Sequence, residues 1–491
     1  MRAFLRGHCL WFGFLALGVL CVAPLHSDDG DRGTAPVLIE ASESANIDFP
    51  GMPALQSFVS ASWNGKWVII GGRTNGYHQT GGRDTDFARP QANQKIWVID
   101  TAGPAPHKIY SAPVAGLPDS LAPVRDQWMA SNILHCQVGD TLYIAGGYGE
   151  NSEHEWVTYP ILSAVSLPAL IEGVMNAKSF HDSISFTQSE LVQSSGGDLI
   201  KLEDGFYLVM GHVFMGTYAD FEGGNEHNST KASQKYLGEI RRLSISRTSS
   251  GLTVALLDRF SNPEFLRRDL NTSYTILPDG KSLGGAAYGG VFTKDQLNFS
   301  RPIYFGPASS PWVDDGYEQK MSAYACAKLL LYDRASSAMY TTFFGGISRW
   351  VWNYQKGQFE AAPLVGDKTK DTYYDGLQWV DQISTLVRHG RQTAEFVQPS
   401  NRLPGAMGAE AAFFPLPGLQ EVRSGTKILD AEQFRGKRML AGYIYGGIRA
   451  YPRQFPYRDD SPAYRPGAVP TKPSDAILKV YVTVPVPRAG G

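Results

Sequence analysis

The chain has 491 residues, of which 43% are hydrophobic and 12% aromatic, and its formal net charge is −2 at pH 7. Such a composition is typical of a folded protein with a large core and excludes a disordered chain. The near-neutral balance argues against steering towards nucleic acid, so we expect no nucleic-acid partner. A polar small molecule, a glycan or a partner protein remains as the expected partner.

The N-terminus has the pattern of a secretory signal peptide. Arg2 and Arg6 precede an apolar stretch over residues 10–23, and polar residues follow at 26–29. We predict a signal peptide over residues 1–27 and a short leader over 28–35. The apolar stretch is short for a membrane-spanning helix and no later run is longer, so we expect no integral membrane segment. Export would place the protein in the periplasm or outside the cell.

A repeated motif dominates the rest of the chain. Hydrophobic runs end in a Gly-Gly pair at Gly71, Gly146, Gly289, Gly345 and Gly446, and a degenerate copy ends at Gly211-His212. Successive copies are 56 to 101 residues apart, which suits a four-stranded sheet with loops of variable length. The repeat predicts an all-β fold, a six-bladed β-propeller over residues 36–486, followed by a tail over 487–491.

Turn signals precede most of the Gly-Gly pairs. They are Asn64-Gly65, Gly139-Asp140, Asp204-Gly205, Asp279-Gly280 and Arg435-Gly436. Such pairs favour tight hairpins, so strand, turn and strand up to Gly-Gly would form the inner half of each blade. The last strand, near residues 476–484, leaves its blade without a fourth strand, and residues 36–41 would supply it. Five or seven blades remain alternatives, because residues 371–396 could form an extra element.

Several fragments resemble the kelch repeat, among them GGRTNGYH, LYIAGGYGE and LGEIRRLSIS. The whole mature chain looks like the exported bacterial kelch-type propellers, a set with no common assigned activity. The resemblance implies the propeller fold. Trp97 matches part of the kelch Tyr and Trp pattern, whereas several other copies lack it, so the subtype is not identified.

Residues that follow the Gly-Gly pairs would converge on one face of a propeller, together with the connections between blades. Aromatic side chains beside charged ones there suit a sugar or a peptide. For any single residue the alternative is a solvated loop. The candidate ligand-binding residues are Arg73, His78, Tyr148, Glu153, His154, His212, Tyr218, Glu226, His227, Arg349, Trp350 and Arg449.

One dipeptide recurs at the same distance from Gly-Gly. Arg125-Asp126 and Arg268-Asp269 each place their Asp 20 residues before the first Gly of the pair. We expect both dipeptides to head an innermost strand beside the central channel. They would then either bind an anionic or polyhydroxylated ligand or form salt bridges that hold neighbouring blades together.

The chain shows no recognisable metal or cofactor motif. The clusters of His and acidic residues lack the spacing of a metal site, so we expect no metal and no cofactor. Cys136 and Cys326 remain after the signal peptide. Export permits a disulfide between them, but they would project from different blades, so we expect both to be buried free thiols.

Two functions remain open at this stage. The first is a non-catalytic, monomeric binding module that takes a carbohydrate, a peptide or a partner protein on the loop face. The alternative is an enzyme, a carbohydrate-active isomerase or a lyase, with Asp126, Arg125, Asp269 and Arg268 as catalytic candidates at the channel. The isomerase reading draws on a resemblance to the periplasmic six-bladed sialic-acid mutarotases.

Overall fold

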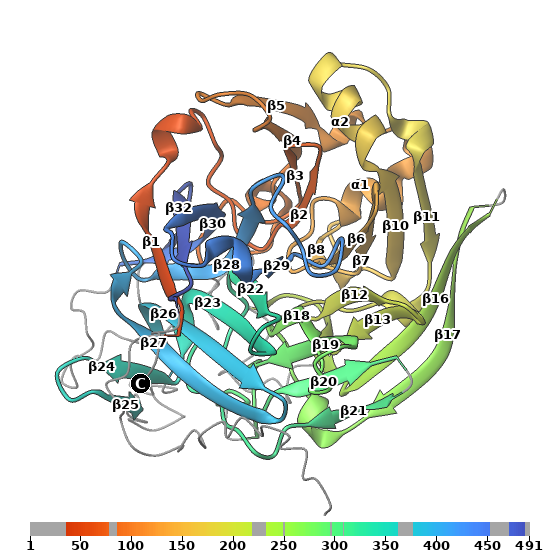
Figure 1. The fold of residues 1–491 in the computed structure, drawn as a ribbon. Coiled ribbons are helices and arrows are strands. Elements are labelled where there is room, and N and C mark those ends of the chain that lie inside the picture. Colours follow the sequence, from red (N-terminus) through yellow and green to blue (C-terminus); the bar gives the residue numbers. More distant parts are fainter. Residues whose placement is uncertain are drawn as a thin grey trace, which may run out of the picture.

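The computed structural model describes residues 36–77, 86–218, 232–248, 251–294, 297–307, 309–361, 377–451 and 471–486. The chain is all-β, built of many small antiparallel sheets that lie around a common centre (Figure 1), as a propeller requires. The described helices include α1 (Ala122–Gln127) and α2 (Leu167–Asn176). The predicted signal peptide, leader and C-terminal tail lie outside the described residues.

Three four-stranded sheets follow one another in the first half of the chain, each ordered from its innermost strand outwards. They comprise β2 (Val59–Trp63), β3 (Lys66–Ile70), β4 (Lys95–Asp100) and β5 (Lys108–Pro113), then β6 (Leu134–Val138), β7 (Thr141–Ala145), β10 (Ile161–Ser166) and β11 (Ile184–Gln188), then β12 (Asp198–Leu202), β13 (Gly205–Val209), β16 (Glu239–Thr248) and β17 (Gly251–Ser261). In each sheet the first two strands form the hairpin that the turn signal predicts.

The second half of the chain adds three more sheets. They comprise β18 (Asn271–Ile276), β19 (Leu283–Tyr288), β20 (Ile303–Gly306) and β21 (Ser309–Val313), then β22 (Lys328–Asp333), β23 (Ala338–Ser348), β26 (Gln378–His389) and β27 (Gln392–Arg402), then β28 (Met407–Pro415), β30 (Met439–Ala450), β32 (Ile477–Thr483) and β1 (Leu38–Ser44). Strand β1 pairs antiparallel with β32, with Leu38 opposite Thr483. Segment 36–41 therefore pairs where the sequence places it.

One sequence expectation about the later part of the chain is wrong. Arg435-Gly436 is no tight hairpin turn, because residues 416–438 connect β28 to β30 and contain β29 (Ile428–Asp430). We call residues 416–438 the insert. Its strand β29 pairs parallel with β22 of the preceding sheet. From Gln378 on, the suspected extra element at 371–396 is β26 and part of β27, two outer strands of the fifth sheet.

Smaller sheets lie outside these six. Strands β8 (Tyr148–Glu150), β9 (Trp156–Thr158), β14 (His212–Met215) and β15 (Ser233–Tyr236) form one of them, and β24 (Trp350–Asn353) and β25 (Gln358–Ala361) pair with each other. The short strand β31 (Thr471–Pro473) pairs with β30. Strands β9 and β10 follow each other closely but belong to different sheets, and Pro160 between them cannot donate a ladder hydrogen bond.

Five backbone hydrogen bonds in series link the six sheets at the centre. Two residues before the innermost strand, Asn132 N–H donates to the Ser57 carbonyl of the preceding sheet (3.2 Å). The same link runs on from Gly196 to Asn132 (3.2 Å), Asp269 to Gly196 (2.6 Å), Ala325 to Asp269 (2.8 Å) and Glu410 to Ala325 (2.9 Å). We call Ser57, Asn132, Gly196, Asp269, Ala325 and Glu410 the central ring.

Aromatic side chains pack between neighbouring sheets. Trp67 stacks on Phe414 with ring centroids 4.3 Å apart, and Tyr143 contacts Phe206 edge to face at 4.9 Å. Each such pair removes a large apolar area from water and holds two sheets together. In the described part of the chain no helix has the length and apolar character to cross a membrane.

Candidate functional site

Two cavities meet at the central ring. The larger, which we call the central cavity, has a volume of about 290 Å³, and the smaller, the aromatic cleft, about 40 Å³. Ser57, Asn132, Asp269 and Glu410 line both. The ring residues therefore separate a space large enough for a small ligand from one that holds little more than water.

The two carboxyl groups of the ring control its charge. Asn132 Nδ2 donates to Asp269 Oδ1 at 3.3 Å, and Arg268 Nε lies 3.8 Å from Asp269 Oδ2. Burial raises the pKa of Asp269, while the charge of Arg268 opposes that rise. Burial, and then the charge of Asp269, raise the pKa of Glu410 to about 8. Near neutral pH Glu410 is therefore mainly a carboxylic acid, and it lies beside a second buried carboxyl group whose charged form Arg268 favours.

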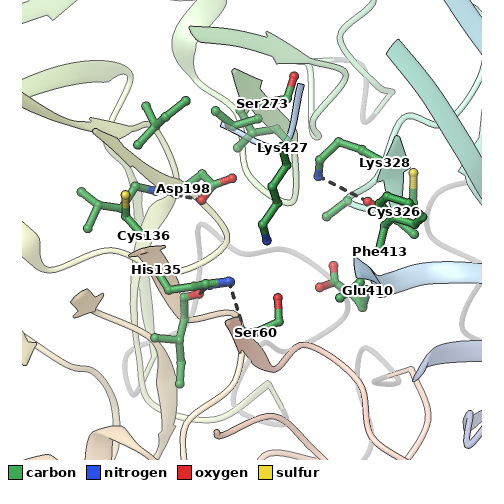
Figure 2. A pocket seen from close by; sticks show the side chains of 18 of the residues that line it. Ser60, His135, Cys136, Asp198, Ser273, Cys326, Lys328, Glu410, Phe413 and Lys427 are labelled. Carbon is green, nitrogen blue, oxygen red and sulfur yellow. Dashed lines mark hydrogen bonds between the residues drawn. The ribbon is translucent and has the colours of Figure 1, made fainter. Parts of the chain in front are cut away.

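Two lysines line the central cavity on different elements. Lys328 begins β22, and its Nζ donates to Asn271 Oδ1 and to the Cys326 carbonyl, both at 3.3 Å. Lys427 lies in the insert, directly before β29. In Figure 2 the Lys427 side chain extends into the middle of the cavity, with Asp198 and His135 on one side and Lys328 and Glu410 on the other.

Burial shifts the pKa values of the remaining titratable groups of the cavity in the direction that favours their uncharged forms. Ser60 N–H donates to His135 Nε2 at 3.3 Å, and burial lowers the pKa of His135 to about 4, which leaves a neutral imidazole. Burial raises the pKa of Asp198 to about 6. Burial also raises the pKa of Cys136 to about 12 and that of Cys326 to about 11, so both are thiols. Both are free and buried, as expected from the sequence.

Two hydroxyl groups of the cavity wall are left without a partner. Thr272 and Ser273 are 5% and 8% exposed, and neither Thr272 Oγ1 nor Ser273 Oγ has a hydrogen-bond partner among the described residues. Buried hydroxyls are normally satisfied, and an orphaned pair at a cavity wall suits a ligand or water that supplies the missing bonds.

The aromatic cleft is filled by its own side chains. The Arg73 guanidinium lies 4.0 Å from the centroid of Phe87 and donates to the Asp86 carbonyl at 2.9 Å. Burial lowers the pKa of Arg73 to about 10. Arg268 Nη1 donates to the Tyr218 hydroxyl at 3.0 Å. Most polar groups of the cleft are thus bonded to a neighbour, although Arg73 Nε has no hydrogen-bond partner among the described residues, and the cleft leaves little room for a ligand.

Six of the sequence-predicted residues come together at the cleft: Arg73, Tyr148, His212, Tyr218, Arg268 and Asp269. Others lie away from both cavities. Glu153 and His154 are exposed, and His154 pairs with Glu150 at 2.6 Å. Arg349, Trp350 and Arg449 are half-buried and line neither cavity, with Trp350 under the Lys320 ammonium. His78, Glu226 and His227 lie outside the described residues.

The expected equivalence of the two Arg-Asp dipeptides is wrong. Asp126 belongs to α1 and accepts from Arg89 Nη1 (2.7 Å) and Ser152 Oγ (2.9 Å), whereas Arg125 Nη2 donates to Asp119 (3.0 Å). The ring position of the second sheet is held by Asn132 instead. Hairpin length explains the mismatch, because six residues separate β18 from β19 and two separate β6 from β7. Asp126 therefore connects the segments that carry Arg89 and Ser152, which fits the alternative of a structural salt bridge better than a ligand at the channel.

Sequence reasoning missed Glu410, Lys328, Lys427, His135 and Asp198. Counting from the start of each innermost strand, rather than from Gly-Gly, places Ser57, Asn132, Gly196 and Asp269 in register, and this is the signal for a ring position. Glu410 escapes even that rule, because β28 starts earlier and its ladder with β30 is irregular between Met407 and Ala409.

Within the described ranges, no three His, Cys, Asp or Glu side chains cluster closely enough to hold a metal ion.

Comparisons with known proteins give little beyond this. No family model and no curated protein sequence matches the chain. A solved structure titled "Structure of YjhT" aligns with 83% of this chain and 98% of its own, at 11% sequence identity and a TM-score of 0.44.

Proposed function

We propose that this chain is an exported, six-bladed kelch-like β-propeller, closed by β1, that binds a small carboxylate-bearing carbohydrate in its central cavity. The six four-stranded sheets, the β1–β32 pairing and the central ring support the architecture. The signal-like N-terminus supports export to the periplasm or beyond.

One observation carries the choice of ligand: a cavity of about 290 Å³ has an anchored ammonium group and a carboxyl pair on its wall. The Lys328 ammonium suits the ligand's carboxylate, since charge-assisted hydrogen bonds are the stronger kind. Glu410 as an acid donates a hydrogen bond, Asp269 accepts one, and the free hydroxyls of Thr272 and Ser273 do either. Such a mixture matches a ring of sugar hydroxyls.

The proposed site differs from the loop face that the sequence favours. The loop-face residues that converge do so around about 40 Å³ and are bonded to one another. A sugar needs several times that volume. We therefore assign the cleft residues a structural role beside the central ring and assign ligand binding to the central cavity.

A second candidate function is acid–base isomerisation of the same sugar acid. It is favoured by the pairing of Glu410, mainly protonated, with Asp269, whose charge Arg268 supports. Two carboxyl groups with separated pKa values supply an acid and a base in one site. NMR measurement of the rate of anomer exchange of glucuronate, with wild type and with Glu410→Gln, tests this function. Exchange that is accelerated by wild type and not by the variant supports catalysis. A wild-type rate equal to the uncatalysed rate contradicts it.

The binding proposal is tested by calorimetric titration of the purified protein with glucuronate, with neutral glucose as the comparison. Asp269→Asn should lower glucuronate affinity about tenfold or more, because it removes a carboxyl acceptor from the cavity wall. Asp126→Asn is the matched control, because Asp126 lies in α1 and lines neither cavity, and it should bind like wild type. Equal losses in both variants, or equal affinity for glucose and glucuronate, would contradict the proposal.

A further inference from the structure

The two lysines of the central cavity are held in opposite ways. The Lys328 ammonium is fixed by two oxygen acceptors at 3.3 Å each. Lys427 has no such contact: among the described residues its Nζ forms neither a hydrogen bond nor an ion pair, and the interactions that reach it act through charge alone. A lysine aimed into a cavity without a counter-ion serves as an amine better than as a fixed charge.

We propose that Lys427 is a nucleophilic amine that forms a Schiff base with the carbonyl carbon of a ligand in the central cavity. This inference rests on the proposed function and narrows its ligand to a carboxylate-bearing compound with an aldehyde or ketone group, such as the open-chain form of a sugar acid.

The insert is built to present this side chain. Gly425 N–H and Thr426 N–H both donate to Glu421 Oε2 (2.6 and 3.2 Å), and the Thr426 hydroxyl donates to the Arg423 carbonyl at 2.6 Å. Lys427 itself adopts a left-handed φ of 58°, which is uncommon for a side chain of this kind. Directly after it, β29 pairs with β22, opposite Leu330. The turn and the strand together fix the direction in which Lys427 leaves the backbone.

The surroundings favour the neutral amine. Burial lowers the pKa of Lys427, and the nearby Lys328 lowers it further, while Glu421, Cys136 and Asp198 act in the opposite direction. Of these three, Cys136 is a neutral thiol near neutral pH and adds little charge, whereas Asp198, with a pKa of about 6, is largely ionised there and opposes the neutral amine. His135 is uncharged and Glu410 mainly protonated. Reactive lysines in proteins are activated in the same two ways, by burial and by a second cation.

The chemistry balances without any further reagent. The amine lone pair of Lys427 forms a bond to the carbonyl carbon, and the carbonyl electron pair moves to oxygen, which takes up a proton. The carbinolamine then loses its hydroxyl group as water, and the nitrogen loses its remaining proton, which leaves an imine. Glu410, an acid on the wall of the same cavity, is suited to protonate the departing oxygen. Lys328 would hold the carboxylate meanwhile.

Trapping by reduction tests the proposal. The protein is incubated with glucuronate and cyanoborohydride, which reduces an imine to a stable secondary amine, and is then digested with trypsin. Alkylated Lys427 resists cleavage, so the expected product is the uncut, mass-shifted peptide over residues 424–435. Labelling at Lys427 should exceed that at Lys437, an exposed lysine of the same insert, at least about tenfold. Lys437→Arg should leave it intact and Lys427→Arg should abolish it.

The outcomes separate this inference from the binding proposal. Gluconate carries a carboxylate but no aldehyde, so it should bind without any label. Labelling spread evenly over exposed lysines, labelling at Lys328 instead, or binding of both acids with no label overturns the role of Lys427 while the binding proposal stands. Failure of both acids to bind overturns both. The wild-type label site needs no variant, so poor folding of Lys427→Arg would not obscure the result.

Discussion

The two sides of the central ring use similar groups to different ends. On the cleft side, Arg73 and Arg268 are bonded to a carbonyl and a hydroxyl and lie over Phe87 and Phe292. On the cavity side, Lys427 and the hydroxyls of Thr272 and Ser273 lack partners among the described residues, around a space several times larger. Richness in charged and aromatic residues therefore does not identify a binding site. Polar groups that lack partners and surround a free volume are the better indicator of a binding site.

The largest effect should come from breaking the packing on the cleft side. Phe214 is fully buried in β14 and lies 4.9 Å from Tyr148 and 4.6 Å from Tyr218 between ring centroids. Phe214→Ala should cost about 3–5 kcal/mol of unfolding free energy, measured by denaturant titration. Ser273→Ala on the cavity side should stay within about 0.5 kcal/mol, because it breaks no bond within the described protein. A larger loss of unfolding free energy in Ser273→Ala than in Phe214→Ala would contradict this difference between the two sides.

Ligand affinity should be more sensitive to substitutions on the cavity side than to substitutions on the cleft side. Lys328→Met removes the anchored ammonium and should weaken glucuronate binding about 10- to 100-fold in calorimetry. Tyr148→Phe removes a cleft hydroxyl that donates to the Gly216 carbonyl, and it should change affinity less than about twofold. If Tyr148→Phe were the more damaging of the two, the ligand would lie in the cleft.

Glu410→Gln should change how stability depends on pH. The folded-state pKa of about 8 lies above the ordinary 4.5, so the folded protein retains a proton that the unfolded chain releases. Stability contributed by that proton is complete below pH 4.5 and is lost as pH rises towards 8. Gln copies the protonated acid, so the variant should melt about 2–4 °C above wild type at pH 8. An equal difference in melting temperature between the two proteins at pH 4.5 and at pH 8 would contradict the raised pKa of Glu410.

The smallest effect should come from the exposed loop. His154 is 80% exposed and pairs with the Glu150 carboxylate at 2.6 Å. His154→Ala should change stability by less than about 0.5 kcal/mol and leave glucuronate affinity as it is, by melting and titration together. A clear loss of affinity would return the binding site to the loop face.

Local patterns in the sequence sufficed for much of the fold. Gly-Gly pairs and turn signals predict the inner hairpins because both depend on neighbouring residues, and the missing partner of β32 predicts the pairing of β1. Arg435-Gly436 misled for the opposite reason: the insert is held by β29 against β22, about a hundred residues away in the chain, which no local turn signal reports.

The candidate site was less predictable than the fold. Asp269 and Arg268 were identified by a spacing that also selected Asp126, and only the length of the β18–β19 hairpin separates the two cases. Lys328 and Asp198 resemble any charged residue in an alternating strand. Lys427 reaches the cavity through a turn whose hydrogen bonds are set by Glu421 and Arg423, and burial of its amine is a property of the assembled fold.

The central claim is that a carboxylate-bearing carbohydrate occupies the cavity on the Lys328 side of the ring. A crystal structure of the protein soaked with glucuronate tests it most directly. We predict density in the central cavity, with the carboxylate at Lys328 Nζ and hydroxyls at Ser273, Asp269 and Glu410. Density in the aromatic cleft or on the outer loops, with the central cavity holding only water, would contradict it.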